Sequence, residues 1–457
     1  ACLPGAHPAI KAVSPQAPVT DEFIGDDANH NGAFFLLDNF DFMNYFGKER
    51  NVPVRDYGSE MFSVKTPDVY DFFLKLGPLK NTQSSKYFDH HSYIWNEYLQ
   101  HDIYDQYWKN RNIRQYLKNI GVPVMVVGGW FDAEDLFGAL HTYEAIEKQS
   151  PGNKNYLVMG PWTHGAWAGR VWDKFATYHF GSNINQYFQD SLETKFFNYY
   201  LKDKANFNAS EATIFETGTN EWKHFTQWPP ADITYVNYYF GTNNNLSVEK
   251  KINDKNFDEY VSDPSKPVPY TNGIYSHRNN EYMAEDQRFA ALRPDVLVYK
   301  TDILNKDLTL AGKISADLFV STSSTDADFI VKVIDVLPDD EVTSAEAPGG
   351  TSIPGYERLV RAEVMRGKFR NDYAKPEAFI PGKVSEVKIN LNDVLHTFKK
   401  GHKIMVQVQS SWFPLVDRNP QKFMRIPDAD DKDFQKATIK IYHDRENESK
   451  LILPVLK

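Results

Sequence analysis

An acid and a histidine, Asp132 and His164, each follow a short apolar segment in the middle of the sequence. The two segments cover residues 122–127 and 156–159, and glycines follow both of them. If both are parallel strands of one sheet, the side chains that follow them lie together beyond the carboxyl ends of the strands. A carboxylate that orients a histidine, which then acts as general base, forms the second half of a Ser-Asp-His relay. The order and placement of this pair therefore predict the acid and base of a hydrolase site.

The segments around the pair must position it. Residues 122–127 form a run short enough for a strand that is covered on both faces. Between residues 135 and 148, apolar side chains recur at spacings of three and four, which predicts an amphipathic helix. Strand, helix and strand make a βαβ unit that places Asp132 and His164 at the same edge. Taken one at a time, however, such an acid is more often a loop or cap residue, and such a histidine more often packs in a core.

Two short motifs enclose the pair. Residues 128–135 read GGWFDAED and residues 160–165 read GPWTHG. Both resemble motifs of the family of cocaine esterases and α-amino acid ester hydrolases, which are serine hydrolases related to X-prolyl dipeptidyl aminopeptidases. The resemblance covers nearly the whole chain and is specific at these motifs and at residues 25–32. It implies that Asp132 orients His164 in a catalytic triad, and that the reaction runs through an acyl-enzyme.

The third member of such a triad, a serine in a Gly-x-Ser-x-Gly turn, has no counterpart in the sequence. In the family, a stretch that resembles residues 7–12 (HPAIKA) comes shortly after this nucleophile turn and the helix that it opens. We therefore expect the chain to be N-terminally incomplete, with the nucleophile and the oxyanion donors upstream of Ala1. Residues 10–13 predict a short strand near the start of the chain.

Acidic residues form a second candidate group. Asp27 ends a Gly-Asp-Asp sequence, and Glu134 and Asp135 lie two and three residues after Asp132. From the residues alone, Asp27 is expected in a solvated turn, and the other two at the start of a helix, where acids cap backbone amides. In the α-amino acid ester hydrolase branch, acids at these positions form a cluster that binds the α-ammonium group of the acyl portion. The resemblance thus implies substrate binding by Asp27, Glu134 and Asp135, and a helix start can cap and bind at once.

Changes in composition and in hydrophobic periodicity along the chain predict its division into domains. Residues 1–33 and 120–205 are expected to form an α/β-hydrolase domain that lacks its nucleophile segment. Residues 34–119 between them are rich in aromatic side chains and contain a predicted helix over 93–117, which resembles a helical cap inserted in the hydrolase sheet. Residues 206–457 are expected to form a jelly-roll β-sandwich. The fold class predicted is therefore α/β plus all-β.

Periodicity supports this division on both sides of the last boundary. Apolar side chains recur at helical spacing over residues 184–201, which predicts an amphipathic helix that closes the hydrolase domain. From about residue 211 the pattern alternates instead, as at the apolar positions 314, 316, 318 and 320. Many short alternating segments separated by turn sequences predict an all-β sandwich, and the family carries a jelly roll in this place.

The composition limits the classes of partner. The 457 residues carry a net charge of −10, which gives no electrostatic support to a nucleic-acid partner. No apolar run approaches the roughly 20 residues that span a bilayer. Cys2 is the sole cysteine, so no disulfide can form within the chain. His90 and His91 have no acids at ligand spacing, so no metal is expected, and no cofactor either.

The function expected is that of a serine hydrolase or acylase that cleaves or transfers acyl groups bearing an α-amino group, from small esters or β-lactam amides. Assembly into a homo-oligomer is left open, and the family suggests a periplasmic or secreted bacterial enzyme. One alternative is another esterase or acylase of the family, such as a glutaryl-cephalosporin acylase, although three acids would repel a glutaryl carboxylate. The other is a non-catalytic binding protein, which an upstream sequence without the serine would favour.

Overall fold

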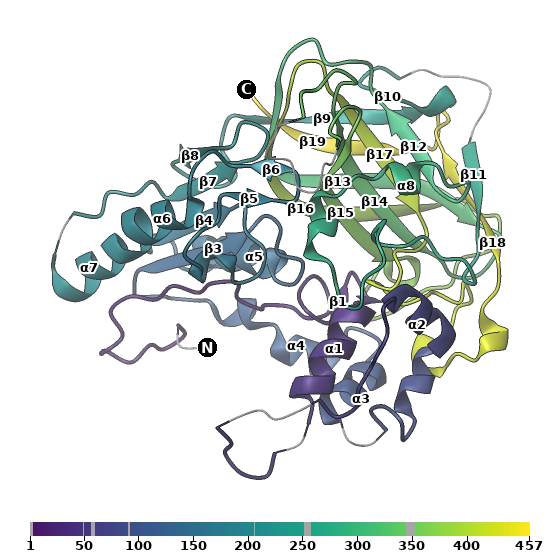
Figure 1. Cartoon of the computed structure of the whole chain (residues 1–457), viewed down its shortest axis with the longest axis horizontal. Coiled ribbons are helices and arrows are strands. Elements are labelled where there is room, and N and C mark those ends of the chain that lie inside the picture. The colour runs from purple at the N-terminus through teal and green to yellow at the C-terminus, as the bar shows by residue number, and fades with distance from the viewer. Residues whose placement is uncertain are drawn as a thin grey trace.

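A mixed α/β region lies on one side of the molecule and a larger all-β region on the other, with a group of short helices at the bottom of the view (Figure 1). This arrangement confirms the predicted fold class. No helix among the described residues is long and apolar enough to cross a membrane. Cys2, His90 and His91 lie outside the described residues. The computed structural model describes residues 3–48, 50–55, 60–89, 92–204, 206–250, 257–343 and 352–457.

A four-stranded sheet contains the predicted βαβ unit. β3 (Val124–Gly129), β4 (Asn155–Gly160) and β7 (Ala212–Glu216) run parallel, and β8 (Glu221–Phe225) pairs antiparallel with β7 at the edge. α5 (Leu136–Gln149) connects β3 to β4. Because β3 and β4 pair in register along their whole length, their carboxyl ends lie side by side. The edge of the sheet therefore collects the residues that follow both strands.

Helices cover both faces of this sheet, as the continuous apolar runs of its strands predict. α5 packs on one face, against residues such as Val126. The other face is covered by α6 (Ile184–Tyr187), a π-helical turn (Phe188–Glu193) and α7 (Thr194–Lys202), which follow one another without a break. The helix predicted over residues 184–201 is therefore present, with a π turn in its middle.

Two details of this sheet differ from what the sequence predicts. The short strand expected over residues 10–13 is replaced by single bridges of Val13 and Gln16 to β3, because Pro15 between them has no N–H to continue a ladder. β7 and β8, which follow residue 206, extend this sheet and not the larger one. All five residues of β7 are buried, so its apolar run suits the interior of a parallel sheet.

The short helices have an aromatic core. They are α1 (Leu36–Phe46), α2 (Val69–Leu76), α3 (Tyr93–Gln100) and α4 (Gln106–Arg111). A hairpin of β1 (Asn29–His30) and β2 (Ala33–Phe34) precedes them, and a second hairpin, β5 (Lys174–Phe175) and β6 (Tyr178–His179), follows β4. The ring of Phe40 lies at the centre of their core, in edge-to-face contact with Phe62, Phe73, Phe88 and Trp95.

The single helix predicted over residues 93–117 is wrong. α3 ends at Gln100, α4 begins after Asp105, and a 3-10 turn over Ile113–Tyr116 follows. The side chains of Asp105 and Asn112 each accept a hydrogen bond from the backbone amide two residues ahead. Polar side chains that cap new helix starts therefore interrupt the apolar periodicity of this segment.

The all-β region is built on one large sheet that curls around a single hydrophobic core. Every strand of the sheet contributes side chains to this core. β13 is 15 residues long and pairs with β16 along one edge and with β18 and β19 along the other. The sheet does not close into a barrel among the described residues, because its order runs from β11 at one end to β15 at the other. Its strands are β9 (Ile233–Gly241), β10 (Asn245–Ser247), β11 (Phe257–Ser262), β12 (Leu297–Lys300), β13 (Leu308–Thr322), β14 (Asp328–Val336), β15 (Glu357–Arg366), β16 (Ser385–Phe398), β17 (Lys403–Gln409), β18 (Ala437–Tyr442) and β19 (Lys450–Leu456), with the short helix α8 (Arg288–Ala291) before β12.

A buried ion-pair network stands at the end of β15. The guanidinium of Arg366 lies 2.9 Å from a carboxylate oxygen of Asp328 and 2.6 Å from one of Asp417, and all three side chains are almost fully buried. Charges in such surroundings are tolerated only in partnership, because each alone would lose its hydration without compensation.

We therefore expect Arg366→Met to lower the free energy of unfolding by about 3–5 kcal/mol, since it leaves two buried carboxylates without their cation. The measurement is chemical denaturation followed by circular dichroism and tryptophan fluorescence. The matched control is Arg445→Met at an exposed arginine, which should change the free energy by no more than about 0.5 kcal/mol. Equal effects of the two substitutions would contradict the role given to this network.

Candidate active site

The turns after β3 and β4 are fixed to one another, and they carry Asp132 and His164. The backbone amide of Phe131 donates a hydrogen bond to the carbonyl oxygen of Trp162 at 2.9 Å. Gly129 permits this approach, because a Cβ at that position would lie 2.2 Å from the same carbonyl oxygen. The backbone therefore holds the two functional side chains at a defined separation.

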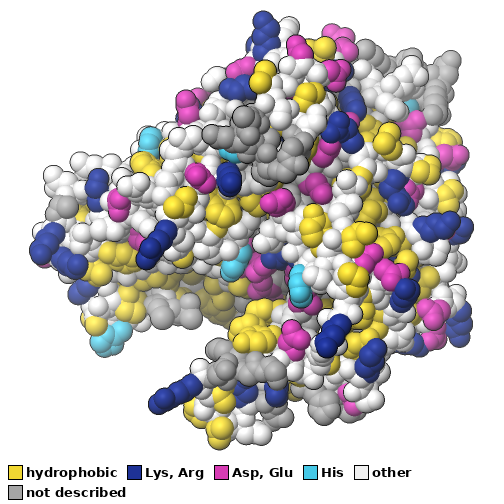
Figure 2. All heavy atoms as spheres, viewed as in Figure 1, with side chains coloured by type: hydrophobic (Ala, Val, Ile, Leu, Met, Phe, Trp, Pro, Cys, Tyr) yellow, Lys and Arg dark blue, Asp and Glu magenta, His cyan; other side chains and the backbone are white. Residues whose placement is uncertain are grey.

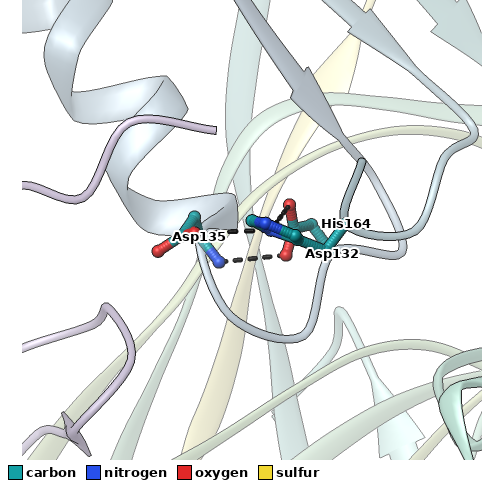
Figure 3. A group of neighbouring side chains, drawn as sticks. All are labelled: Asp132, Asp135 and His164. Carbon is teal, nitrogen blue, oxygen red and sulfur yellow. Dashed lines mark hydrogen bonds and ion pairs between the residues drawn. The ribbon is translucent and has the colours of Figure 1, made fainter. Parts of the chain in front are cut away.

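The structure brings Asp132 and His164 into direct contact. Nδ1 of His164 lies 3.1 Å from Oδ2 of Asp132 (Figure 3). Oδ1 of Asp132 accepts hydrogen bonds from the backbone amides of Glu134 and Asp135, at 3.0 Å each. The Asp132 side chain is fully buried, whereas 42% of the His164 side chain is exposed. Because Nδ1 faces the acid, Nε2 is the ring nitrogen left to meet a reacting group.

The acids around His164 favour its protonated form. Besides Asp132, carboxylate oxygens of Asp135 and Glu134 lie 3.4 Å and 3.8 Å from Nδ1. The hydrogen bond with Asp132 raises the pKa of His164 to about 9, against the opposing effect of burial, and the charges of the surrounding acids add to it. The same acids would stabilise the imidazolium that forms when Nε2 of the neutral ring takes a proton.

The start of α5 is capped by the carboxylates of Asp132 and Asp26, and not by those of Glu134 and Asp135. Asp135 occupies the N-cap position, but its side chain makes no capping hydrogen bond. Asp132 binds the first two amides of this turn, and Oδ1 of Asp26 accepts from the amide of Gly138 at 2.7 Å. Capping, the explanation that the sequence left open, therefore does not account for the side chains of Glu134 and Asp135.

Asp26 also anchors the loop that carries Asp27. Its buried carboxylate accepts hydrogen bonds from the amide and the hydroxyl of Thr20 and from the amide of Asp21. Asp27 follows with a φ of 37°, a left-handed backbone conformation that is costly for a residue with a Cβ. Such strain persists where the surrounding structure fixes the residue, and it is frequent at functional sites.

Asp27, Glu134 and Asp135 come together beside His164. One carboxylate oxygen from each lies within 4.8 Å of the others, a spacing that suits a small cation. Asp135 is buried, and its Oδ1 has no hydrogen-bond partner among the described residues. Burial, followed by the charges of neighbouring acids, raises the pKa of Asp27 to about 7 and that of Asp135 to about 11. These raised pKa values favour the protonated forms of Asp27 and Asp135 until a cation compensates the charge. The expectation that this cation is not a metal stays a prediction.

Arg278 also reaches this cluster, and sequence reasoning missed it. Its guanidinium donates hydrogen bonds to Asp38 at 2.5 Å, to Asn280 at 2.8 Å and to Glu134. It stands 144 positions from Glu134 along the chain, in a loop of the all-β region. Because neither a motif nor a spacing links the two residues, only the folded chain reveals the contact.

A pocket of about 500 Å³ opens beside the cluster. Asp27, Glu134 and Arg278 form part of its lining. In the space-filling view, a notch separates the α/β region from the short helices, and histidine and acidic side chains gather at its inner end (Figure 2). The short helices contribute an apolar and aromatic wall to the pocket, with Phe42, Met43, Phe46, Ile94 and Tyr98.

Comparison with known proteins relates this chain to hydrolases. A sequence profile described as the X-Pro dipeptidyl-peptidase C-terminal non-catalytic domain matches residues 205–452, and that of the X-Pro dipeptidyl-peptidase (S15 family) matches residues 1–166. A cocaine esterase of Rhodococcus sp. (strain MB1 Bresler) is 28% identical over 377 residues, which cover 80% of this chain and 62% of that esterase. The chain thus spans less than two thirds of the length of this curated relative.

Two solved structures resemble the chain over its whole length. An aminopeptidase from the marine sediment archaeon Thaumarchaeota archaeon shares 35% sequence identity at a TM-score of 0.92, and the match covers 100% of this chain and 74% of that one. An α-amino acid ester hydrolase shares 32% identity at a TM-score of 0.91, with 99% of this chain and 74% of that one covered. At these values the likeness extends to the sequence as well as to the fold.

The contact between Asp132 and His164 is open to a direct test. Asp132→Asn removes the charge beside Nδ1, so it should lower the pKa of His164 by about 1–3, starting from about 9. The measurement is an NMR titration of the histidine rings, with the signals of His164 assigned through His164→Gln. Glu144→Gln is the matched control, because it removes the acid that pairs with His141 at 2.7 Å and should leave His164 unchanged. An unaltered pKa in Asp132→Asn would contradict this account of the pair.

Proposed function

The chain belongs to the X-Pro dipeptidyl-peptidase (S15) family, and from this premise we propose that it is the acid–base and substrate-binding part of a serine hydrolase for acyl groups with a free α-amino group. The observation that carries the proposal is the carboxylate cluster beside His164, with a buried Asp135 oxygen that has no partner in the described residues. Acids that repel one another are held together where a cation is expected.

In this proposal His164 acts as the base and Asp132 positions it. A serine hydroxyl attacks the acyl carbon while Nε2 of His164 takes its proton, and the leaving alcohol or amine then receives that proton. The acyl-enzyme that results is hydrolysed when water attacks the same carbon, again through His164, and the proton returns to the serine. Asp132 stays ionised throughout and stabilises the imidazolium.

The cluster would bind the α-ammonium group of the acyl portion. A primary ammonium has three N–H donors, and charge-assisted hydrogen bonds to carboxylates are stronger than neutral ones. Two of the structural relatives are named an aminopeptidase and an α-amino acid ester hydrolase, and both names denote substrates with a free α-amino group. A glutaryl acyl group, which ends in a carboxylate, would instead be repelled by Asp27, Glu134 and Asp135.

The pocket beside the cluster would hold the side chain of the acyl group. Its wall from α1 and α3 is apolar and aromatic, which favours hydrophobic acyl side chains. This assigns residues 34–119 the role of a cap over the hydrolase site formed by residues 1–33 and 120–205. Residues 206–457 form the β-domain behind it, apart from β7 and β8, which extend the hydrolase sheet. The partners proposed are therefore small esters or amides.

The serine nucleophile is proposed to lie outside residues 1–457. No Gly-x-Ser-x-Gly turn occurs in the sequence, and no hydroxyl group of the described residues hydrogen-bonds to His164. A protein of these 457 residues alone should therefore show no turnover of an activated ester such as p-nitrophenyl acetate. Turnover that persists through purification and disappears in His164→Ala would show that the nucleophile has been misplaced.

In the full-length enzyme, Asp135→Asn should raise KM for a phenylglycine ester about tenfold, through the loss of one charge-assisted hydrogen bond. This is the lower end of the usual range, because the ammonium group must first displace the proton that Asp135 retains. KM for the matching phenylacetate ester, which has no amine, should barely change. Asp190→Asn, at an exposed acid, is the control for a change in net charge. Equal effects of Asp135→Asn on both esters would refute ammonium binding at this residue.

A further inference from the structure

Arg278 is the one arginine among the described lining residues of the pocket. Its three hydrogen bonds go to three different segments, and 15% of its side chain is exposed. Asp38 lies on α1, Glu134 follows β3, and Asn280 belongs to its own loop. These three contacts hold the planar guanidinium of Arg278 in place, so its positive charge has a fixed position.

The acids near Arg278 outnumber the cations. Glu134 is the member of the cluster that Arg278 contacts directly, while Asp27 and Asp135 have no arginine or lysine within 4.0 Å among the described residues. Arg278 therefore cancels part of the negative charge that a substrate meets. The titratable groups around the cluster and the pocket are Glu22, Asp26 and Asp27 from the N-terminal loop, His30 from β1, Asp38, Asp41 and Tyr45 from α1, Tyr98 from α3, Asp132, Glu134 and Asp135 between β3 and α5, His164 after β4, and Tyr270, His277, Arg278 and Tyr282 from the all-β region.

We propose that Arg278 is a positioning residue that determines specificity: it fixes the carboxylate of Glu134 in place and adjusts the charge of the cluster so that one ammonium group completes it. This inference rests on the proposed function, because it assumes that the cluster binds the α-ammonium group. It extends that function, since it assigns the selection of a single positive charge to a residue of the all-β region.

Removing Arg278 should have a pH-dependent effect. A nearby cation favours the ionised form of a carboxyl group, so the loss of Arg278, which contacts the cluster through Glu134, makes protonation of the cluster more favourable. An ammonium ligand needs ionised acceptors, and its affinity is lost as pH falls through the pKa values of the cluster. In Arg278→Met the loss of affinity should therefore occur at higher pH than in the wild type, where Asp27 titrates at about 7.

Asp38→Asn should shift the affinity profile in the opposite direction. Asp38 competes with Glu134 for the guanidinium, so its neutralisation leaves more of the Arg278 charge to the cluster. The pKa values of the cluster should then fall, and ammonium binding should extend to lower pH. Opposite shifts from two variants of one ion pair are not expected from general damage to the fold.

The experiment measures ligand binding to the chain by ligand-observed NMR between about pH 6 and 8, a range that stays about one unit or more below the pKa of a benzylic amine, so that the probe remains protonated. The probe is 1-phenylethylamine, and its neutral counterpart 1-phenylethanol reports binding that does not involve the charge. At about pH 7, Arg278→Met should bind the amine about fivefold more weakly, as expected when the pKa of Asp27 rises by about one from about 7, and the difference should shrink towards pH 8. Arg278→Lys, which retains the charge, should recover much of the affinity.

The possible outcomes separate the two proposals. A wild-type chain that binds the amine and the alcohol equally contradicts the proposed function, and this inference with it. If the wild type prefers the amine, and neither Arg278→Met nor Asp38→Asn changes that preference at any pH, the role of Arg278 is overturned and the proposed function is not. If thermal unfolding shows that Arg278→Met does not fold, the direction of the Asp38→Asn shift decides: a shift to lower pH supports the proposal, and any other result overturns it.

Discussion

The buried carboxylate of Asp132 binds the start of α5 with one oxygen and the imidazole of His164 with the other. A buried carboxylate is stable only when its oxygens are satisfied, and here three donors from two loops satisfy them. The helix start and the histidine are consequently fixed by the same side chain. Because Asp132 binds the amides at the helix start, Glu134 and Asp135 are left without a capping role, and the cluster depends on the same carboxylate as the contact with His164.

The cluster carries a cost in stability that a cation would relieve. The pKa values of Asp27 and Asp135 are raised in the folded chain, so folding favours their protonated forms. This contribution is complete at pH values below the unfolded pKa of an aspartate and is lost as pH rises, through about 7 for Asp27 and about 11 for Asp135. At neutral pH the acids thus weaken the fold, and an arrangement of this kind is characteristic of functional sites.

The sequence predicts those parts of the structure that local chemistry determines. Apolar runs and helical spacing are local, and they located the βαβ unit and the contact between Asp132 and His164. The predicted helix over residues 93–117 failed because side-chain caps compete with helix continuation, which hydrophobic spacing does not record. β7 joins the four-stranded sheet by pairing with β4, a segment far from it in the sequence, and β8 joins by pairing with β7. The contacts of Arg278 likewise could not be predicted from the sequence, because only the fold brings it to its partners.

Arginines from the all-β region bring positive charge close to Asp132, His164 and the carboxylate cluster. Arg278 contacts Glu134, and Arg361 on β15 donates a hydrogen bond at 2.9 Å to the carbonyl of Trp130, two residues before Asp132. Like charges in the cluster repel, so the electrostatic balance of the site requires these cations as much as it requires the acids. The all-β region matches a domain described as non-catalytic, yet it supplies a guanidinium to Glu134 and another to the backbone that leads to Asp132. An α/β region without it would retain the motifs but present a more negative site.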